Sequence, residues 1–242
     1  MERWRLITTW GADPGFNMGL DEALLEGADG APTVRFYSWS PDTLSLGYFQ
    51  KLADVPGAAR AGALVRRITG GGAIHHSGEL TFSLSAPLAH PLFRGPVAES
   101  YARVHAAVIA ALAAVGVEAE LCGARDLASD REGTGMCFHA STPLDVVWNA
   151  RKGVGSAQRR RDGRVLHHGS IKLASSPLEG AIATIREAAP AVDLAAFAAV
   201  LRAAFERELG IALESDVPSP RERTRARELG KRYLERAFVE RR

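Results

Sequence analysis

The chain of 242 residues has only two cysteines, Cys122 and Cys137. Two thiols cannot form the disulfide framework of a small secreted domain, so we expect both to be free. Apolar runs are also short: the longest, over 106–117, has 12 residues, whereas a membrane-spanning helix needs about 18. The first residues, MERWRLITTW, lack the apolar centre of a signal peptide. These absences predict a cytoplasmic protein with no membrane segment.

The excess of one sign of charge over the other is also small. The net charge is +2, which gives no support for a nucleic-acid partner. Its distribution is uneven, because residues 221–242 hold nine Lys and Arg against four Asp and Glu. We predict a basic helix from about Pro220. Two interpretations of it stay open: a solvated amphipathic helix held by side-chain ion pairs, or a surface that recruits acidic proteins.

The pattern of apolar residues predicts an α+β fold. Steps of three and four residues predict helices over 96–115 and 194–209, and a shorter helix over 17–26 has Asn17 as its expected N-cap. Runs rich in β-branched and aromatic residues predict strands over 33–39, 43–48, 64–68, 80–84, 117–121, 144–160 and 164–173. The Asp162-Gly163 pair predicts a hairpin between the last two strands.

Strands joined by turns favour a mainly antiparallel sheet flanked by helices. Residues 122–142 lack periodicity and are predicted to form a loop. No repeat, low-complexity linker or break in composition marks a domain boundary, so we expect one domain over 1–242.

Three consecutive glycines lie in the stretch RRITGGGAIHHSGELTFS, which covers 66–83. They have two interpretations. Gly70, Gly71 and Gly72 can form a flexible hairpin turn, or they can let the main chain press against a ligand that a side chain would block.

A second glycine pair occupies the predicted strand NARKGVGSAQRR, over 149–160. Gly153 and Gly155 can mark a β-bulge, or they can leave room for a slender ligand beside the strand. In the second case Lys152 would be a fixed positive charge at the reactive end of that ligand, since an ammonium group donates well to carbonyl or phosphate oxygen.

Cys137 lies in the polar loop segment MCFHAST. A lone cysteine is commonly a small buried apolar residue, and we assign that role to Cys122. If Lys152 approaches Cys137, however, its thiolate becomes available as a nucleophile. The histidine pairs 75–76 and 167–168 do not predict a metal site, because adjacent residues on a strand point to opposite faces.

These motifs together resemble the lipoate–protein ligase A and octanoyltransferase family. The resemblance rests on the stretch 66–83, with its pattern RRxTGGxAxxH…ELTxS, and on four further segments in the family's order: NMGLDEALL, TLSLGYFQ, CFHAST and RKGVGSAQRR…VLHHGSI. It covers about 3–210 and leaves out the basic tail, 214–242. It implies a biotin/lipoate protein ligase-like domain. It also implies attachment of an octanoyl or lipoyl group to a lysine of a lipoyl domain, in glycine cleavage H protein or in the E2 subunit of a 2-oxoacid dehydrogenase.

Three reactions share this scaffold in the family. Ligases activate the acid with ATP and Mg²⁺, octanoyltransferases take octanoate from acyl carrier protein through a cysteine thioester, and amidotransferases move it between lipoyl domains. Cys137 and the ELTFS segment are more similar to the cysteine-dependent, LipM-type octanoyltransferases, which need no cofactor. Gly72 completes a triple glycine more typical of ligases, so a ligase with a separate accessory domain stays open. A non-catalytic acyl-binding module is a further alternative.

The resemblance also implies roles for individual residues. Cys137 is the expected nucleophile, and Lys152 is expected to bind the carbonyl oxygen. His139, His75 or His76 is expected to accept the proton of the acceptor lysine. The residues expected to shape the substrate site are Arg66, Gly70, Gly71, Gly72, His75, His76, Gly155, Ser156 and Ala157.

Overall fold

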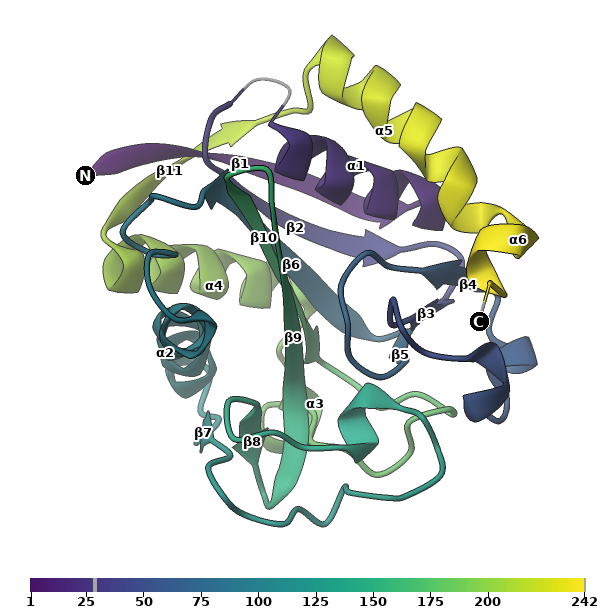
Figure 1. Cartoon of the computed structure of the whole chain (residues 1–242). Coiled ribbons are helices and arrows are strands. Elements are labelled where there is room, and N and C mark those ends of the chain that lie inside the picture. The colour runs from purple at the N-terminus through teal and green to yellow at the C-terminus, as the bar shows by residue number, and fades with distance from the viewer. Residues whose placement is uncertain (28–29, 242) are drawn as a thin grey trace.

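The computed structural model describes residues 1–27 and 30–241, and two sheets form in this part of the chain (Figure 1). The larger has eight strands in the order β11-β1-β2-β6-β10-β9-β8-β7, and the smaller has three in the order β4-β3-β5. The strands are β1 (Glu2–Ala12), β2 (Thr33–Trp39), β3 (Thr43–Leu46), β4 (Ala63–Arg66), β5 (Ile74–His76), β6 (Glu79–Pro87), β7 (Glu120–Leu121), β8 (Val146–Trp148), β9 (Arg151–Arg161), β10 (Arg164–Lys172) and β11 (Ile211–Asp216).

Helices cover both faces of the larger sheet. They are α1 (Pro14–Glu26), α2 (Val97–Ala114), α3 (Ile185–Ala188), α4 (Leu194–Leu209), α5 (Pro220–Leu234) and α6 (Arg236–Val239), with short 3₁₀ turns η1 (Leu52–Asp54), η2 (Ala58–Arg60) and η3 (Cys137–His139). Helices α2 and α4 pack on one face, where Val108 and Phe205 join the main apolar core. Helices α1 and α5 lie on the other face, together with the smaller sheet (Figure 1).

The predicted α+β class and mainly antiparallel sheet are confirmed. The pairings of β2 with β6, β6 with β10, β10 with β9, β9 with β8 and β8 with β7 are all antiparallel. Only β1 departs from this pattern among the described strands of the larger sheet, since it runs parallel to both β2 and β11. The predicted hairpin is also present: Asp162 and Gly163 have φ of 52° and 72° between β9 and β10, as a two-residue type I′ turn requires.

Several element boundaries differ from those predicted. Helix α1 begins at Pro14 and its N-cap is Asp13, while Asn17 is buried and its side-chain oxygen accepts a hydrogen bond from Arg35 at 3.1 Å. The predicted strand over 144–160 is broken into β8 and β9, because Asn149 and Ala150 adopt left-handed φ of 51° and 55°. Strands β1, β5 and β11 were not predicted.

The basic tail forms a helix, as predicted, and this helix packs directly on α1. A Cβ atom on Gly19 would lie 2.0 Å from the carbonyl oxygen of Ala226 in α5. Only glycine therefore permits the observed approach of the two helices. The tail also makes ion pairs with α1: Arg225 bonds Glu26 at 2.7 Å and Arg232 bonds Glu22 at 2.5 Å. These contacts support the interpretation of the tail as an ion-paired amphipathic helix.

Helix α2 is the one described helix that is long and apolar enough to cross a membrane by length and composition. Its residues Val104, Ala107, Val108, Ala111 and Leu112 are buried in the main core. Packing against the sheet and α4 accounts for its apolar face.

Candidate active site

The backbone around Cys137 is held by the glycine stretch. Ala73 accepts a hydrogen bond from the N–H of Cys137 at 2.7 Å and donates one to Gly135 at 2.8 Å. A Cβ atom on Gly72 would lie 2.8 Å from the Cys137 nitrogen. Gly72 thus serves the close approach of two main chains and fixes where the cysteine begins its 3₁₀ turn.

Lys152 lies against Cys137, which is the condition under which the sequence predicts a nucleophilic cysteine. Its Nζ donates to the carbonyl oxygens of Cys137 at 2.8 Å and Ala140 at 3.0 Å. It also pairs with Asp145 at 2.8 Å and lies 3.6 Å from the Cys137 sulfur. The lysine side chain is almost fully buried, whereas Cys137 is partly exposed. A buried, fixed cation therefore lies beside a thiol that solvent can reach.

The charge of Lys152 is stabilised by its neighbours. Burial by itself lowers the pKa of this lysine, but Cys137 and Asp145 more than offset that effect and raise its pKa above the ordinary value. The ammonium form consequently persists throughout the physiological pH range.

The two strand glycines have different roles. A Cβ atom on Gly155 would lie 3.0 Å from the Cys137 sulfur, so this position keeps the space beside the thiol free. A Cβ atom on Gly153 would lie 1.9 Å from the indole of Trp148, which fills the space over that glycine. Gly155 thus borders the candidate site, and Gly153 serves core packing.

A cavity begins at Cys137 and runs between the larger sheet, α1 and the smaller sheet. Its lining residues are Met18, Tyr37, Trp39, Ser45, Arg67, Gly70, Gly71, Ile74, His76, Thr81, Cys137, Gly155, Ser156, Ala157, His168, Gly169 and Ser170. Across adjacent strands Gly155 pairs with Ser170, and Ser170 pairs with Thr81. This row of residues crosses the sheet away from the cysteine. The cavity is narrow, with a volume of about 30 Å³.

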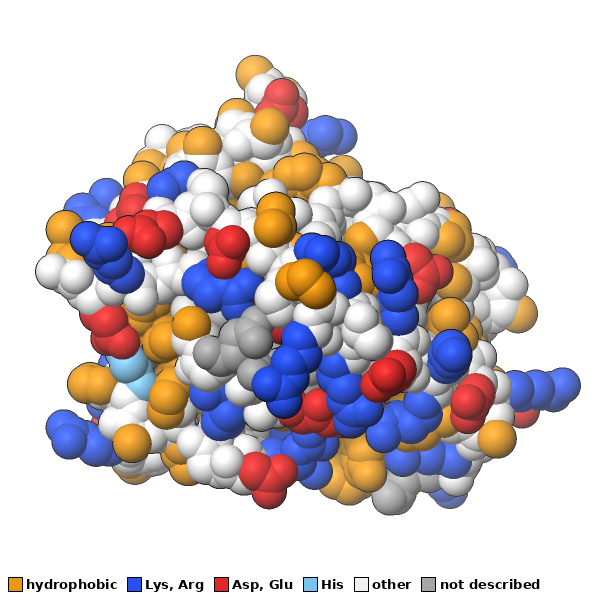
Figure 2. All heavy atoms as spheres, turned by 90° about the horizontal axis from the view of Figure 1, so that it is seen from above, with side chains coloured by type: hydrophobic (Ala, Val, Ile, Leu, Met, Phe, Trp, Pro, Cys, Tyr) orange, Lys and Arg blue, Asp and Glu red, His pale blue; other side chains and the backbone are white. Residues whose placement is uncertain are grey.

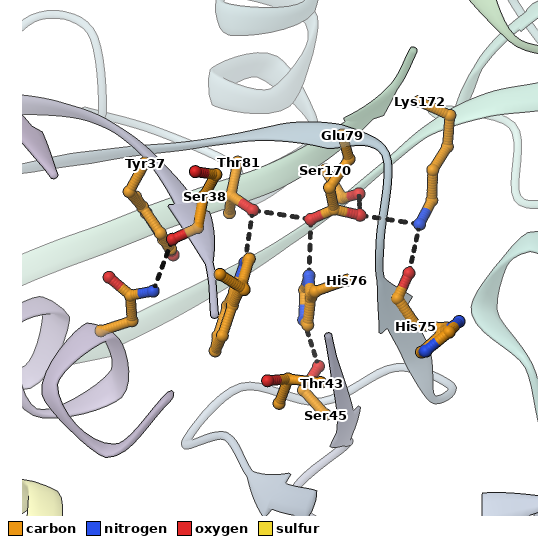
Figure 3. A network of polar contacts seen from close by, with 12 residues as sticks. Tyr37, Ser38, Thr43, Ser45, His75, His76, Glu79, Thr81, Ser170 and Lys172 are labelled. Atoms are coloured by element: carbon orange, nitrogen blue, oxygen red, sulfur yellow. Dashed lines mark hydrogen bonds and ion pairs between the residues drawn. The ribbon is translucent and has the colours of Figure 1, made fainter. Parts of the chain in front are cut away.

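The wall of the cavity away from Cys137 is a buried polar network, drawn in Figure 3. His76 bonds Glu79 through Nδ1 at 2.6 Å and Ser45 through Nε2 at 2.7 Å. Lys172 donates to Glu79 at 2.7 Å and pairs with Glu179 at 2.8 Å. Trp39 stacks on the ring of His76 at 4.1 Å between ring centres.

Electrostatics in this network fix the state of its histidine. Burial lowers the pKa of His76 despite the nearby carboxylate of Glu79, so the imidazole is neutral at pH 7. Burial raises the pKa of Glu79, but Lys172 and His76 outweigh it and hold that pKa well below the ordinary value. Glu79 is therefore a carboxylate that accepts from Nδ1–H, which leaves Nε2 as the acceptor for the Ser45 hydroxyl.

Some residues expected at the substrate site lie elsewhere. Arg66 is buried and donates to the carbonyl oxygens of Gly47 at 2.8 Å and Val239 at 2.5 Å, so it ties the end of the chain to the smaller sheet. The cavity is lined by the neighbouring Arg67 instead. Gly72 packs against the main chain of Cys137 and does not line the cavity.

Of the three histidines expected at the site, only one lines the cavity. His75 points to Asp42, 2.8 Å away, and His139 bonds the carbonyl oxygen of Glu179 at 2.6 Å, so neither lines the cavity. His76 does. The side chain of Ser156 points to the opposite face of the sheet, where it bonds His105 at 2.8 Å.

Sequence reasoning missed Asp145, Arg67 and the Glu79 network. Asp145 is the second residue of the predicted strand over 144–160, with no motif to mark it, and it reaches Lys152 only through the fold. Glu79 belonged to a quoted motif, but its contact with Lys172 joins residues 93 positions apart.

No group of three or more His, Cys, Asp or Glu side chains in the described residues is arranged to hold a metal ion. The absence of a metal remains a prediction. The histidine pairs do point to opposite faces of their strands: His167 packs on Phe82, and His168 bonds Thr69.

Comparison with known proteins decides the family. Residues 13–205 match the sequence profile of the lipoyl protein ligase A/B catalytic domain. The chain belongs to this family. The motifs that suggested the resemblance lie entirely within the matched range and supply Cys137, Lys152 and Gly155 of the candidate site.

Relatives within the lipoyl protein ligase A/B family extend this result. An octanoyltransferase LipM of Moorella thermoacetica is 45% identical over 179 residues, covering 71% of this chain and 66% of that relative. This chain thus spans just under two thirds of that relative's length. An octanoyltransferase LipM of Clostridioides difficile is 33% identical over 90% of this chain and 83% of its own length.

Solved structures show the same fold. A bipartite lipoate protein ligase from Thermoplasma acidophilum superimposes with a TM-score of 0.78, covering 99% of this chain and 96% of its own, at 21% identity. The fold predicted from the motifs is therefore confirmed.

Proposed function

We propose that this chain is an octanoyltransferase of protein lipoylation that works through a thioester on Cys137. The observation that carries the proposal is the contact of a partly exposed cysteine with a buried lysine at one end of a narrow cavity. The names of the LipM relatives support octanoyl transfer. We further propose that acyl carrier protein is the donor, that a lipoyl domain is the acceptor, and that the reaction takes place in the cytoplasm without ATP or a metal.

The first step forms the acyl-enzyme. The thiolate of Cys137, stabilised by the adjacent ammonium, attacks the carbonyl carbon of the octanoyl thioester. The bond between that carbon and the carrier's sulfur breaks, and the carrier leaves as a thiolate, which takes up from solvent the proton that Cys137 released when its own thiolate formed. In the second step the acceptor lysine amine attacks the Cys137 thioester, which gives an amide and returns the cysteine.

Lys152 stabilises the oxyanion formed in both steps. Its ammonium already has Cys137 O, Ala140 O and Asp145 as partners. Because an ammonium has only three N–H groups, the substrate oxygen must replace one of them. We assign this exchange to Ala140, whose oxygen is the most distant of the three. Donors in such positions are commonly worth about 2.7–4 kcal/mol of barrier.

The row Gly155, Ser170 and Thr81 suits an eight-carbon chain. Two strand spacings span about 9.6 Å, and seven carbon–carbon bonds extend about 8–9 Å. The chain's methyl end would then reach the Trp39–His76 stack. A cavity of about 30 Å³ holds about two waters, so the acyl chain must displace a lining side chain. Met18, which is unbranched and flexible, is the side chain best able to move.

A proton leaves the acceptor amine in the second step. Of the three histidines considered, His76 is the one that lines the cavity. His76 belongs to the wall away from Cys137, where the methyl end of the chain would lie, so the acyl chain separates it from the reacting amine. We therefore propose that the amine proton passes to the departing Cys137 sulfur.

The decisive experiment mixes the protein with octanoyl-acyl carrier protein, without ATP, and measures intact mass. We expect one octanoyl adduct on Cys137 and transfer to an added lipoyl domain. Cys137→Ala should abolish both, whereas Cys122→Ala should retain most activity, because Cys122 is buried beside Leu127 and Val147. Full transfer by Cys137→Ala would refute the thioester mechanism.

Two other reactions are outcomes of the same assay. The triple glycine and the fold shared with a bipartite ligase favour, as a second candidate, an ATP-dependent ligase with a separate accessory domain. That activity would appear only with ATP, Mg²⁺ and free octanoate. An amidotransferase would load Cys137 from an octanoylated lipoyl domain and not from the carrier.

A further inference from the structure

A hollow lined by four arginines lies beside the cavity. It has a volume of about 130 Å³ and is lined by Glu22, Tyr48, Ile68, Arg159, Arg161, Arg232, Phe238 and Arg241. Among the described residues of this lining Glu22 is the only carboxylate, and Arg161 and Arg232 share it at 3.1 and 2.5 Å. The lining therefore has a surplus of three positive charges.

Arg159 and Arg241 are the two arginines of the hollow whose charge is not balanced by a carboxylate of the described residues. Within the described residues neither has a carboxylate at salt-bridge distance, and the buried Nε of Arg159 has no hydrogen-bond partner. Both guanidinium groups lie over the ring of Tyr48, at 5.6 Å for Arg159 and 3.9 Å for Arg241. Two like charges thus share one tyrosine ring, and an anion bound to both would offset their repulsion.

The hollow and the cavity share one strand face. Every second residue of β9 from Gly155 to Arg161 lies on the same face of the strand. Gly155 and Ala157 line the cavity, and Arg159 and Arg161 line the hollow. In the described part of the chain β8 pairs with β9 only as far as Val154, so from Gly155 onward β9 has β10 on one side and no paired strand on the other. Tyr101 already bonds the backbone of Gln158, and a strand-like ligand would use the other N–H and C=O groups of this edge.

This arrangement matches the chemistry of a phosphopantetheine thioester. Gly155, next to the Cys137 sulfur, lies four residues from Arg159, or about 13 Å along the strand. About thirteen bonds separate the sulfur and phosphorus of phosphopantetheine, which extends to about 15 Å when scaled from an extended peptide. The two amides of the arm can pair with this edge of β9 as an added strand does. Arginine forks are well suited to phosphate oxygens.

We propose that the hollow binds the phosphate of the donor's phosphopantetheine arm, with Arg159 and Arg241 as its main ligands. This inference rests on the proposed octanoyl transfer. It adds a specificity element: a donor is selected by its phosphate as well as by its acyl chain, and the acceptor lysine must approach after the arm has left this edge.

The test compares octanoyl-pantetheine with octanoyl-4′-phosphopantetheine, which differ only in the phosphate. We expect kcat/KM for loading Cys137 to be at least about tenfold higher with the phosphate, as a charged hydrogen bond supplies. In Arg159→Gln/Arg241→Gln this ratio should fall to about one. The matched control Arg221→Gln removes an exposed arginine of α5 outside the hollow and should keep the ratio. Equal rates with both donors in the unaltered protein would overturn the proposal, as would an unchanged ratio in the double variant.

Calorimetric titration with 4′-phosphopantetheine separates this inference from the proposed function. Binding that needs Arg159 and Arg241, in a protein that transfers octanoate from no thioester, would support the phosphate site and refute the transferase. Transfer without any phosphate preference would do the reverse. Octanoyl-coenzyme A carries the same arm without a carrier protein. If the hollow recognises the phosphate alone, Arg159→Gln/Arg241→Gln should lower kcat/KM for loading Cys137 from octanoyl-coenzyme A and from octanoyl-acyl carrier protein alike.

Discussion

Asp145 holds Lys152 in place at the candidate nucleophile. It accepts from the ammonium and, through the same Oδ2, from the N–H of Thr142 at 2.7 Å. Asp145→Asn would leave a buried cation without its carboxylate. Breaking a buried pair costs about 3–5 kcal/mol, and we expect urea denaturation to show a loss near the lower end because asparagine keeps one oxygen. Asp126→Asn, at an exposed position of the same loop, should change stability little. Equal effects of the two variants would contradict this role.

Gly153 and Gly155 give opposite predictions for the same substitution. Gly155→Ala should slow octanoylation of Cys137 at least about tenfold and leave the unfolding free energy nearly unchanged, because the new methyl meets only the sulfur and the end of Lys152. Gly153→Ala should destabilise by about 1–3 kcal/mol, the usual cost of overpacking, because Trp148 occupies the space. Rates and denaturation curves of both variants test the pair; a similar profile for the two would show that the strand has one role.

Individual functional residues could be predicted from the sequence where the residues next to them in the chain form an unusual pattern. Cys137 and Lys152 were identified because each lies in an unusual local context. Asp145 and Arg67 were missed because their significance arises from contacts across the fold. Arg66 and Arg67 are adjacent, and only the direction of each side chain decides which one lines the cavity.

The packing of α5 on α1 makes the tail part of the structure that carries Glu22 and Met18. Gly19→Ala should lower the unfolding free energy by at least about 3 kcal/mol, since its methyl would collide with the main chain of α5 and a backbone atom cannot rotate away. Thr224→Ala, on the exposed side of α5, is the control. Thermal unfolding of the two variants measures the difference. A Gly19→Ala protein as stable as the control would show that α5 is displaced at little cost.

Elements with strong local patterns were predictable, and those defined by distant partners were not. Helices α2 and α4 follow from apolar spacing and the β9–β10 hairpin from Asp162-Gly163. Strand β11 was missed because its pairing with β1 joins residues more than 200 positions apart. The break between β8 and β9 was missed because left-handed φ at Ala150 is imposed by the surrounding fold and not by its own preference.

At the scale of the whole molecule, charge is mixed. Figure 2 shows basic and acidic side chains interspersed over the face seen from above, with basic ones more numerous. The arginines of α5 form ion pairs with α1, Arg225 with Glu26 at 2.7 Å and Arg232 with Glu22 at 2.5 Å. Much of the tail's charge is thus neutralised locally. The arginine hollow, to which the tail supplies Arg232 and Arg241, is a more specific basis for the proposed donor recognition than long-range attraction by the tail.

Buried neutral histidines make the stability of the molecule depend on pH. Burial lowers the pKa of His105 to about 4 and also lowers those of His167 and His76. Unfolding exposes these rings, which then take up protons near pH 6.5. Since the unfolded state binds more protons than the folded state below that pH, the unfolding free energy must fall as pH falls.

For His105 alone the loss between pH 7.5 and pH 5 is about 2 kcal/mol. Carboxylates with lowered pKa, such as Asp21, lose their contribution only below about pH 4.5. Burial raises the pKa of Glu179, so this group increases the unfolding free energy as pH falls. Its contribution is the same in every variant compared. His105→Gln can keep bonds to Leu144 and Ser156 without titrating. Urea denaturation at the two pH values should therefore show a pH difference about 2 kcal/mol smaller in His105→Gln than in the unaltered protein. If His105→Gln loses as much stability as the unaltered protein on acidification, the folded ring is already charged at pH 5 and its hydrogen bond to Ser156 must run in the other direction.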